Sequence, residues 1–225
     1  TDPPGEVNDE RPAWSPDGEL ILFYRPGDPS NDIYKVNPDI LGSEVKLISD
    51  ATSPSWSPDG SMIAYVTDES IWVADSDGTP QFQVTSDGSH PCWSPDGQRI
   101  AYSNNSRIHV VDLDGSDDII ISSPSAGEYD GSPNWSPDGE KIIFERKSSS
   151  IWIMTPDGSN AQDLTPGMSD AKDPDWQTIP PEPEEPPVGG ELIAKTVQLN
   201  LAIILAGLSA LYLLAGTALK KNYTI

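Results

Sequence analysis

The side chain types that could do chemistry in this chain recur in one pentapeptide, Trp-Ser-Pro-Asp-Gly, whose copies begin at Trp14, Trp56, Trp93 and Trp135. A serine nucleophile is activated by one base at one place, so a serine that returns in every copy indicates a structural position. The chain also contains no Gly-x-Ser-x-Gly sequence, the strained turn that exposes the serine of α/β-hydrolases. We therefore expect no catalytic residue and no enzymatic activity.

The residues that could bind a metal are few. His90 and His109 are the only histidines and Cys92 is the only cysteine, without the spacing of a zinc site. The stretches Asp75–Gly78 and Asp112–Gly115 resemble the opening of a calcium loop but lack the glutamate at its twelfth position. We expect hairpin turns there, a small buried hydrophobic role for Cys92, and neither a metal nor a cofactor.

The spacing of the pentapeptides indicates the fold. Successive tryptophans lie 42, 37 and 42 residues apart, and Pro174-Asp175-Trp176 repeats part of the motif 41 residues after Trp135. These spacings are near the roughly 40–45 residues of a four-stranded propeller blade. The sequence therefore predicts an all-β protein, a β-propeller of about four four-stranded blades.

Each repeat reads as four strands. A first strand ends at the tryptophan, the Pro-Asp-Gly turn reverses the chain, and three runs rich in β-branched and aromatic residues follow. The predicted second strands are Leu20–Tyr24, Met62–Val66, Ile100–Tyr102 and Lys141–Phe144. The predicted third strands are Asp32–Val36, Ile71–Ala74, Ile108–Val111 and Ile151–Met154. The predicted fourth strands are Val45–Ile48, Gln81–Val84, Asp118–Ile121 and Ala161–Leu164.

The repeated tryptophans and aspartates have structural explanations. A tryptophan offers a large apolar surface to the layer between neighbouring blades, and an aspartate before glycine completes a tight turn. A carbohydrate-stacking role for the tryptophans is the alternative. The residues expected to hold the blades together are Trp14, Trp56, Trp93, Trp135, Trp176, Asp17, Asp59, Asp96 and Asp138.

The repeat resembles that of TolB-type propellers, because Pro54–Thr85 reads Pro-x-Trp-Ser-Pro-Asp-Gly, then Ile-Ala-Tyr, Ile-Trp-Val and a terminal Val-Thr. The resemblance extends from about Glu10 to Trp176 and implies the fold more than any one function. TolB-type propellers usually have six blades, so four repeats leave closure of the ring open. A closed four-bladed ring, a ring completed by a partner, and a chain lacking N-terminal blades are the alternatives.

A second informative feature is Leu201–Leu219, which contains no charged residue. A helix of this length spans the roughly 30 Å hydrocarbon core of a bilayer, so we expect one C-terminal transmembrane α-helix within 191–221. Lys220 and Lys221 follow it, which favours a cytoplasmic C-terminus and a propeller on the periplasmic or extracellular side. A tail-anchored protein with a cytosolic propeller is the rival topology.

The remaining boundaries follow from composition. We expect an N-terminal extension at 1–9, the propeller at 10–178, a Pro/Glu-rich linker at 179–190 and a short tail at 222–225. In the helix, small residues recur every fourth position, a pattern that lets transmembrane helices pack closely. These helix-packing residues are Ala202, Ala206 and Ala210.

The formal net charge of −23 argues against nucleic acid as a partner, because phosphates repel an acidic surface. The sequence therefore predicts a membrane-anchored, non-catalytic scaffolding subunit of a larger membrane complex, of a respiratory, photosynthetic or transport kind. Its helix would contact integral membrane subunits and its propeller an exoplasmic protein. The alternative is an exoplasmic receptor module that binds a small ligand or glycan at the propeller mouth.

Overall fold

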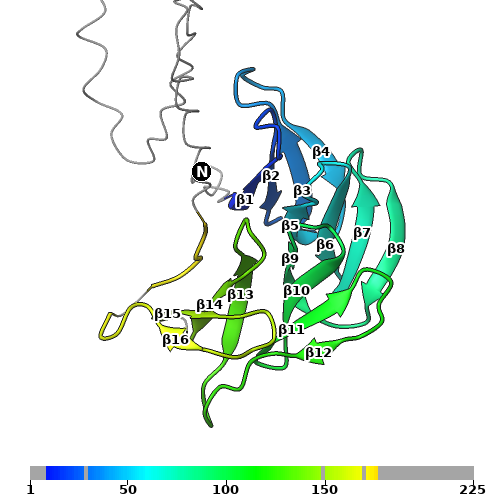
Figure 1. Ribbon diagram of the computed structural model, residues 1–225. Coiled ribbons are helices and arrows are strands. Elements are labelled where there is room, and N and C mark those ends of the chain that lie inside the picture. Colours follow the sequence, from blue (N-terminus) through cyan, green and yellow to red (C-terminus); the bar gives the residue numbers. More distant parts are fainter. Residues whose placement is uncertain (1–8, 28–29, 148–149, 169–170, 177–225) are drawn as a thin grey trace, which may run out of the picture. The chain divides into compact units, whose positions relative to one another are not determined.

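The computed structural model describes residues 9–27, 30–147, 150–168 and 171–176, and these form sixteen strands in four sheets (Figure 1). Residues 1–8 of the predicted extension, the linker, the predicted helix with Ala202, Ala206 and Ala210, and the tail lie outside the described residues. Among the described residues, no helix is long and apolar enough to cross a membrane.

Each sheet is one repeat of the sequence. The first contains β1 (Glu10–Trp14), β2 (Ile21–Arg25), β3 (Asp32–Val36) and β4 (Val45–Ile48), and the second β5 (Thr52–Trp56), β6 (Met62–Thr67), β7 (Ser70–Asp75) and β8 (Pro80–Thr85). The third contains β9 (Ser89–Trp93), β10 (Arg99–Asn104), β11 (Arg107–Asp112) and β12 (Ile119–Ile120), and the fourth β13 (Asp130–Trp135), β14 (Ile142–Arg146), β15 (Ser150–Met154) and β16 (Gln162–Asp163).

The strands of every sheet pair antiparallel in chain order, which confirms four four-stranded blades in a propeller arrangement. Every predicted strand is present, with ends that differ from the prediction by one or two residues in most cases. The largest differences are at the carboxyl ends of β10 and β14, which extend two residues beyond the predicted strands, whereas β12 and β16 are one residue shorter at each end than predicted.

The hydrophobic core lies between successive blades. Leu22 and Ile33 of the first blade pack in one cluster with Trp56 and Ile63 of the second. Equivalent clusters join the second blade to the third and the third to the fourth. Each blade therefore buries its apolar faces against its neighbours in the chain, as the repeat pattern requires.

A further repeat begins after the fourth blade. The indole N–H of Trp176 donates to the carbonyl oxygen of Asn134 at 3.1 Å, as that of Trp93 donates to Ser55 at 3.2 Å. Residues 171–176 thus occupy the place of a first strand beside β13. Among the described strands, those of the first and fourth blades make no contact with each other, so contacts between these two blades do not close a ring.

Candidate functional site: the first strands and their turns

In every pentapeptide, the serine and the aspartate bond to each other. The Ser57 hydroxyl donates to Asp59 Oδ1 at 2.6 Å and its oxygen accepts the Met62 N–H at 2.9 Å. The other copies repeat both bonds, and all four serines are buried. The hydroxyl is therefore used within its own turn, where side-chain to backbone bonds fix the reversal of the chain.

The turn also keeps its carboxylate ionised. Hydrogen bonds from the Ser57 hydroxyl and then the Ser61 N–H lower the pKa of Asp59 to about 2. The equivalent serine is the first cause of the lowered pKa of Asp17, Asp96 and Asp138. An acceptor-only aspartate cannot act as a general acid near neutral pH.

Successive turns pack in a row. A Cβ built on Gly60 would lie 3.5 Å from the Pro16 ring, and one on Gly97 would lie 3.5 Å from Pro58. Proline of one repeat thus faces glycine of the next. Since these glycines have φ near +70°, they also supply the left-handed conformation that ends the turn.

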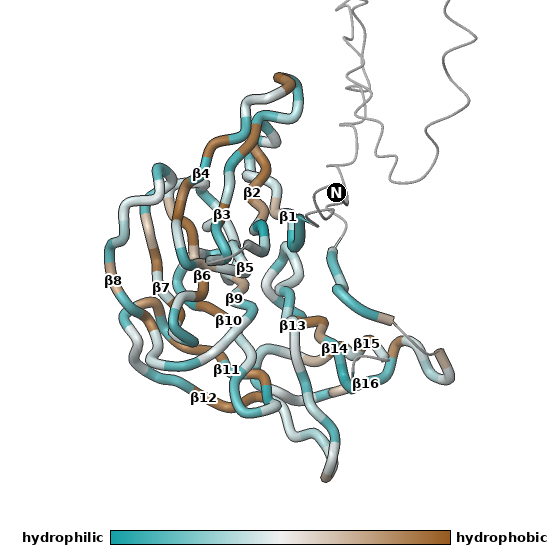
Figure 2. Tube along the Cα trace, turned by 180° about the vertical axis from the view of Figure 1, so that it is seen from behind, coloured by the Kyte–Doolittle hydropathy of each residue, from teal (hydrophilic) through white to brown (hydrophobic). Residues whose placement is uncertain are grey.

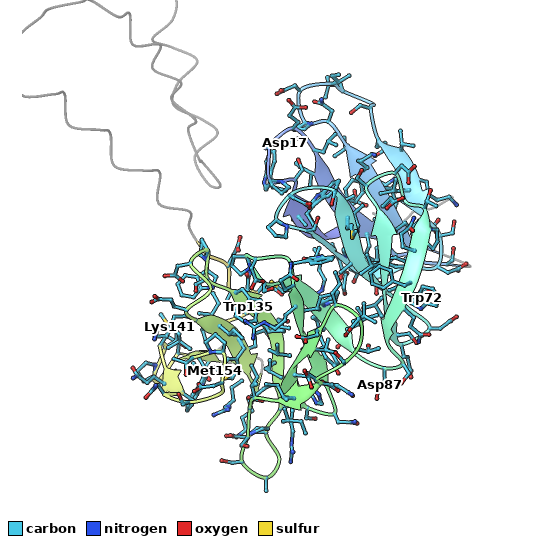
Figure 3. The ribbon with its side chains drawn as sticks, turned by 45° about the vertical axis from the view of Figure 1, so that its right-hand side comes forward. Asp17, Trp72, Asp87, Trp135, Lys141 and Met154 are labelled. Carbon is cyan, nitrogen blue, oxygen red and sulfur yellow. The ribbon has the colours of Figure 1, made fainter. Side chains whose placement is uncertain are left out.

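The five tryptophans do not share one environment. Trp56, Trp93 and Trp135 are 8%, 6% and 4% exposed and lie between blades, as Figure 3 shows for Trp135. Trp176 is partly buried. Trp14 is 58% exposed, because the described residues include no blade before the first to cover it. Trp14 can therefore have the expected packing role only if residues other than the described ones cover it.

A second exposed apolar group lies at the same end of the first blade. The β3–β4 loop, residues 37–44, carries the exposed Ile40 and the fully exposed Leu41, and Val45 follows it. The tip of this loop is brown in Figure 2. Its shape is fixed internally, since the Ser43 hydroxyl donates to the Asn37 carbonyl and accepts the Asn37 N–H. In the other blades the same connection is a short polar Asp-Gly turn. We call Trp14, Ile40, Leu41 and Val45 the first-blade apolar end.

The first strands share a feature that the sequence patterns did not reveal. Each is bulged at the residue three positions before its tryptophan, and this residue has φ near +50° although it is not glycine and precedes proline. The five are Arg11, Ser53, His90, Ser132 and Asp173. Left-handed non-glycine residues are often strained and concentrate at functional sites. The one sequence signal that could have revealed these residues is the proline two positions before each tryptophan, because each left-handed residue directly precedes it.

Three of these residues, an ion pair and a histidine, lie near one another across the first strands. Arg11 Nη1 lies 3.8 Å from Asp173 Oδ1, joining the first blade to the segment after the fourth. His90 lies near both. Burial, and then the positive charge of Arg11, lower the pKa of His90 to about 4, and its Nδ1 has no hydrogen-bond partner among the described residues.

The other histidine belongs to a separate cluster in the third blade. Asp118 accepts from the Tyr102 hydroxyl at 2.9 Å and lies 3.1 Å from His109 Nδ1. Tyr102 and His109 are buried on paired strands, so this cluster ties β12 to its sheet. Burial raises the pKa of the Cys92 thiol to about 11. Among the described residues, no group of three His, Cys, Asp or Glu side chains could hold a metal ion.

Comparisons with known proteins agree with this architecture. The family model of the TolB β-propeller domain (PD40) matches residues 5–179. No sequence among the curated proteins matches the chain.

Three solved structures show similar folds. A TolB of Agrobacterium tumefaciens has a TM-score of 0.63 at 23% identity, over 72% of this chain and 67% of that one. TolB of Acinetobacter baumannii has a TM-score of 0.62 at 21% identity, over 73% and 45%. An oligogalacturonate lyase of Vibrio parahaemolyticus has a TM-score of 0.53 at 18% identity, over 72% and 55%. The chain thus spans less than half of one TolB, and the fold is shared by an enzyme as well.

Proposed function

Because this chain belongs to the TolB β-propeller family, whose propeller indicates a protein-interaction module, we propose that it is a membrane-anchored, non-catalytic docking subunit. Its acidic propeller binds and stabilises a larger membrane protein complex on the exoplasmic side.

The first-blade apolar end is the observation that supports docking. Large apolar side chains are individually common on protein surfaces, but neighbouring ones such as Ile40 and Leu41 can mark an interaction site. Trp14 lies at the same end of the sheet but on its opposite edge strand. Trp14 is 58% exposed where its three counterparts are 8% or less. The β3–β4 loop presents Ile40 and Leu41 at a connection that is a polar turn in the other blades. A protein partner that covers this end would bury side chains that the described residues leave in water.

Anchoring rests on the uncharged run Leu201–Leu219. Its length suits a bilayer, and Lys220 and Lys221 favour a cytoplasmic C-terminus. The linker at 179–190 would hold the propeller away from the membrane, and the stripe of Ala202, Ala206 and Ala210 would pack against integral membrane subunits.

Co-purification of the tagged full chain from native membranes in mild detergent tests the proposal. The double variant Ile40→Ser/Leu41→Ser should lose its partners. The matched control Ile119→Ser/Ile120→Ser changes two exposed isoleucines on β12 and should retain them. If both variants keep the same partners as the unchanged chain, or if the unchanged chain purifies alone, docking through this end is refuted.

The alternative function is a receptor for a small ligand or glycan at the propeller mouth. The Arg11–Asp173 ion pair and the nearby uncharged His90 favour it, because a few polar side chains placed together can orient a ligand. Thermal unfolding of the full chain with a panel of sugar acids and neutral sugars tests this function. A ligand should raise the melting temperature of the unchanged chain but not that of Arg11→Gln. If no member of the panel raises the melting temperature, the receptor function loses its support.

A further inference from the structure

The segment 171–176 has the conformation of a paired first strand without a strand to pair with. Its Trp176 indole makes to Asn134 the hydrogen bond that Trp93 makes to the blade before it. Its Asp173 has φ of 47° and precedes proline, as the bulged residue of each first strand does. In β5, β9 and β13 the bulge accompanies pairing with a second strand. The segment 171–176 pairs with no strand among the described residues.

Side-chain contacts with the fourth blade hold this segment in place. The Asp173 N–H donates to Oε1 of the buried Glu145 at 2.5 Å. The Asn134 amide donates to Asp175 Oδ1 at 3.0 Å and to the Pro174 carbonyl oxygen at 3.4 Å. The first strand of a further blade is therefore already positioned, and what it lacks is a second strand.

The face of the fourth blade that a following blade would cover is apolar. We call Ile151, Ile153 and Leu164 the fourth-blade open face. Leu164 is 50% exposed, and Ile151 and Ile153 are partly buried. Strand register and the N–H bond to the third strand identify their equivalents in the third blade, which are all 6% exposed or less. These equivalents are Ile108, Val110 and Ile121.

The complete blades show what covers such a face. In each of the three inter-blade clusters, the second strand of the following blade supplies two apolar side chains, at the seventh and ninth positions after the repeat tryptophan. The first is isoleucine and the second is aromatic, and all are 3% exposed or less. They are Ile63 and Tyr65, Ile100 and Tyr102, and Ile142 and Phe144. An extended strand with the pattern Ile-x-Tyr or Ile-x-Phe is therefore complementary to the fourth-blade open face.

We propose that a β-strand of a partner protein, with the pattern Ile-x-Tyr or Ile-x-Phe, pairs antiparallel with 171–176 and covers the fourth-blade open face. An unpaired strand edge is a template for another chain. In strand addition of this kind, main-chain hydrogen bonds give affinity and pockets for alternate side chains give specificity. The site lies on the fourth blade and depends neither on membrane anchoring nor on the first-blade apolar end.

The sequence after the segment favours a separate polypeptide as the source of this strand. Residues 179–190 contain five prolines. Proline cannot donate to a strand ladder and is confined to edges and bulges of sheets. The second strand of a blade has neighbours on both sides, so residues 179–190 do not suit that position.

The experiment uses a second strand of the chain itself as the probe. The acetylated and amidated peptide Gln98–Asn104 is added to the 15N-labelled full chain in detergent micelles. The indole N–H signal of Trp176, identified by its absence in Trp176→Phe, should shift and saturate. The same peptide with Ile100→Ser and Tyr102→Ser should bind at least about tenfold more weakly, because its apolar contact is lost. Absence of binding, or equal binding of the serine peptide, overturns the proposal.

Two N-methylated versions of the peptide test the backbone pairing. Alternate N–H groups of a strand point to opposite neighbours, so methylation of one alternate set removes the bonds to 171–176 and methylation of the other set leaves them. One methylated peptide should therefore bind at least about tenfold more weakly than the other. Equal binding of both would mean apolar contact without strand pairing and would overturn strand addition.

Variants of the chain test the location. Leu164→Ser removes an apolar side chain from the fourth-blade open face and should weaken binding of the peptide several-fold. Ile120→Ser is the matched control, since Ile120 is 52% exposed on β12, and should bind the peptide as the unchanged chain does. Equal binding by the two variants refutes the location. Light scattering in the same micelles tests a second copy as the occupant. A dimer that dissociates on Leu164→Ser would assign the face to a second copy and overturn the choice of a partner protein.

This proposal and docking through the first blade fail separately. The double variant Ile40→Ser/Leu41→Ser should bind the peptide as the unchanged chain does, because its changes lie on the first blade. Loss of partners by this variant with unchanged peptide binding supports both proposals. Absence of peptide binding by the unchanged chain overturns strand addition alone and leaves the co-purification result as it is.

Discussion

Replacing Ser57 by alanine removes two interactions at once from the turn of the second blade. The hydroxyl is buried, so the Met62 N–H that it accepts at 2.9 Å would lose its acceptor. A buried donor without a partner costs about 1–3 kcal/mol, and the partial burial of Met62 places the expected loss in the lower half of that range. Ser61→Ala is the matched control, since this exposed hydroxyl also bonds Asp59 but accepts no backbone N–H, and should cost about 0.5 kcal/mol or less.

The same substitution should change the response to acid. Asp59 has its folded-state pKa lowered to about 2 from a usual 3.8, first by Ser57. A lowered carboxyl pKa stabilises the folded state above its usual pKa, and this stabilisation is lost as the pH falls toward 2. Because the alanine variant lacks the largest single cause of this lowered pKa, the stability difference between the two proteins should be largest at neutral pH and smaller near pH 2.

Urea unfolding of the full chain, followed by tryptophan fluorescence at several pH values, measures both effects. If Ser57→Ala and Ser61→Ala lose equal stability, the hydrogen bond from the Met62 N–H to the Ser57 hydroxyl does not account for the loss. If the loss on Ser57→Ala is constant from neutral pH to about 2, the coupling between the serine and the carboxylate is refuted.

Three further predictions concern burial, steric space and topology. Trp93→Ala should cost about 3–5 kcal/mol as a buried aromatic and Trp14→Ala about 1 kcal/mol or less in the isolated chain, both measured by urea unfolding; equal losses would contradict the packing described. Gly158→Ala should lower stability more than Gly18→Ala, because both have positive φ but only at Gly158 would a Cβ strike the backbone of Ile121; similar melting temperatures would contradict this. Protease added to intact cells or spheroplasts should remove the propeller and leave a fragment with the C-terminal hydrophobic run, whereas a protected propeller would reverse the proposed topology.

Much of the blade architecture could be predicted because its signals are local. The Pro-Asp-Gly turns and the period-two runs act over a few residues, so the strands of all four repeats were placed within one or two residues in most cases. Local signals could not predict how the repeats differ in their surroundings. Trp14 has the same pentapeptide as Trp93, but its exposure depends on whether a preceding blade is present.

Several features of the candidate site could not be predicted, because they depend on strand register and on contacts between residues far apart in the sequence. The left-handed residues before proline were hidden because Arg11, Ser53 and His90 share no side-chain type, and a preceding position is usually extended. Contacts of basic side chains between blades were hidden for a similar reason. The Lys35 ammonium on β3 donates to the Ser76 carbonyl oxygen of the second blade, and the Arg99 guanidinium on β10 lies over the Trp135 ring of the fourth. Only the three-dimensional stacking of blades brings these groups together.

Apart from the ion pair between Arg11 and Asp173, the described strands of each blade contact only those of its neighbours in the chain, and this gives the propeller the thermodynamics of a linear array. Stability in such arrays is a sum of unit and nearest-neighbour terms, so the first and fourth blades, each with one described neighbour, should open before the second and third. Amide hydrogen exchange would then be slowest in β6 and β10 and faster in β2 and β14. The first-blade apolar end lies on a unit that frays early. Binding of a partner there should therefore slow amide hydrogen exchange throughout the first blade, including residues that the partner does not contact.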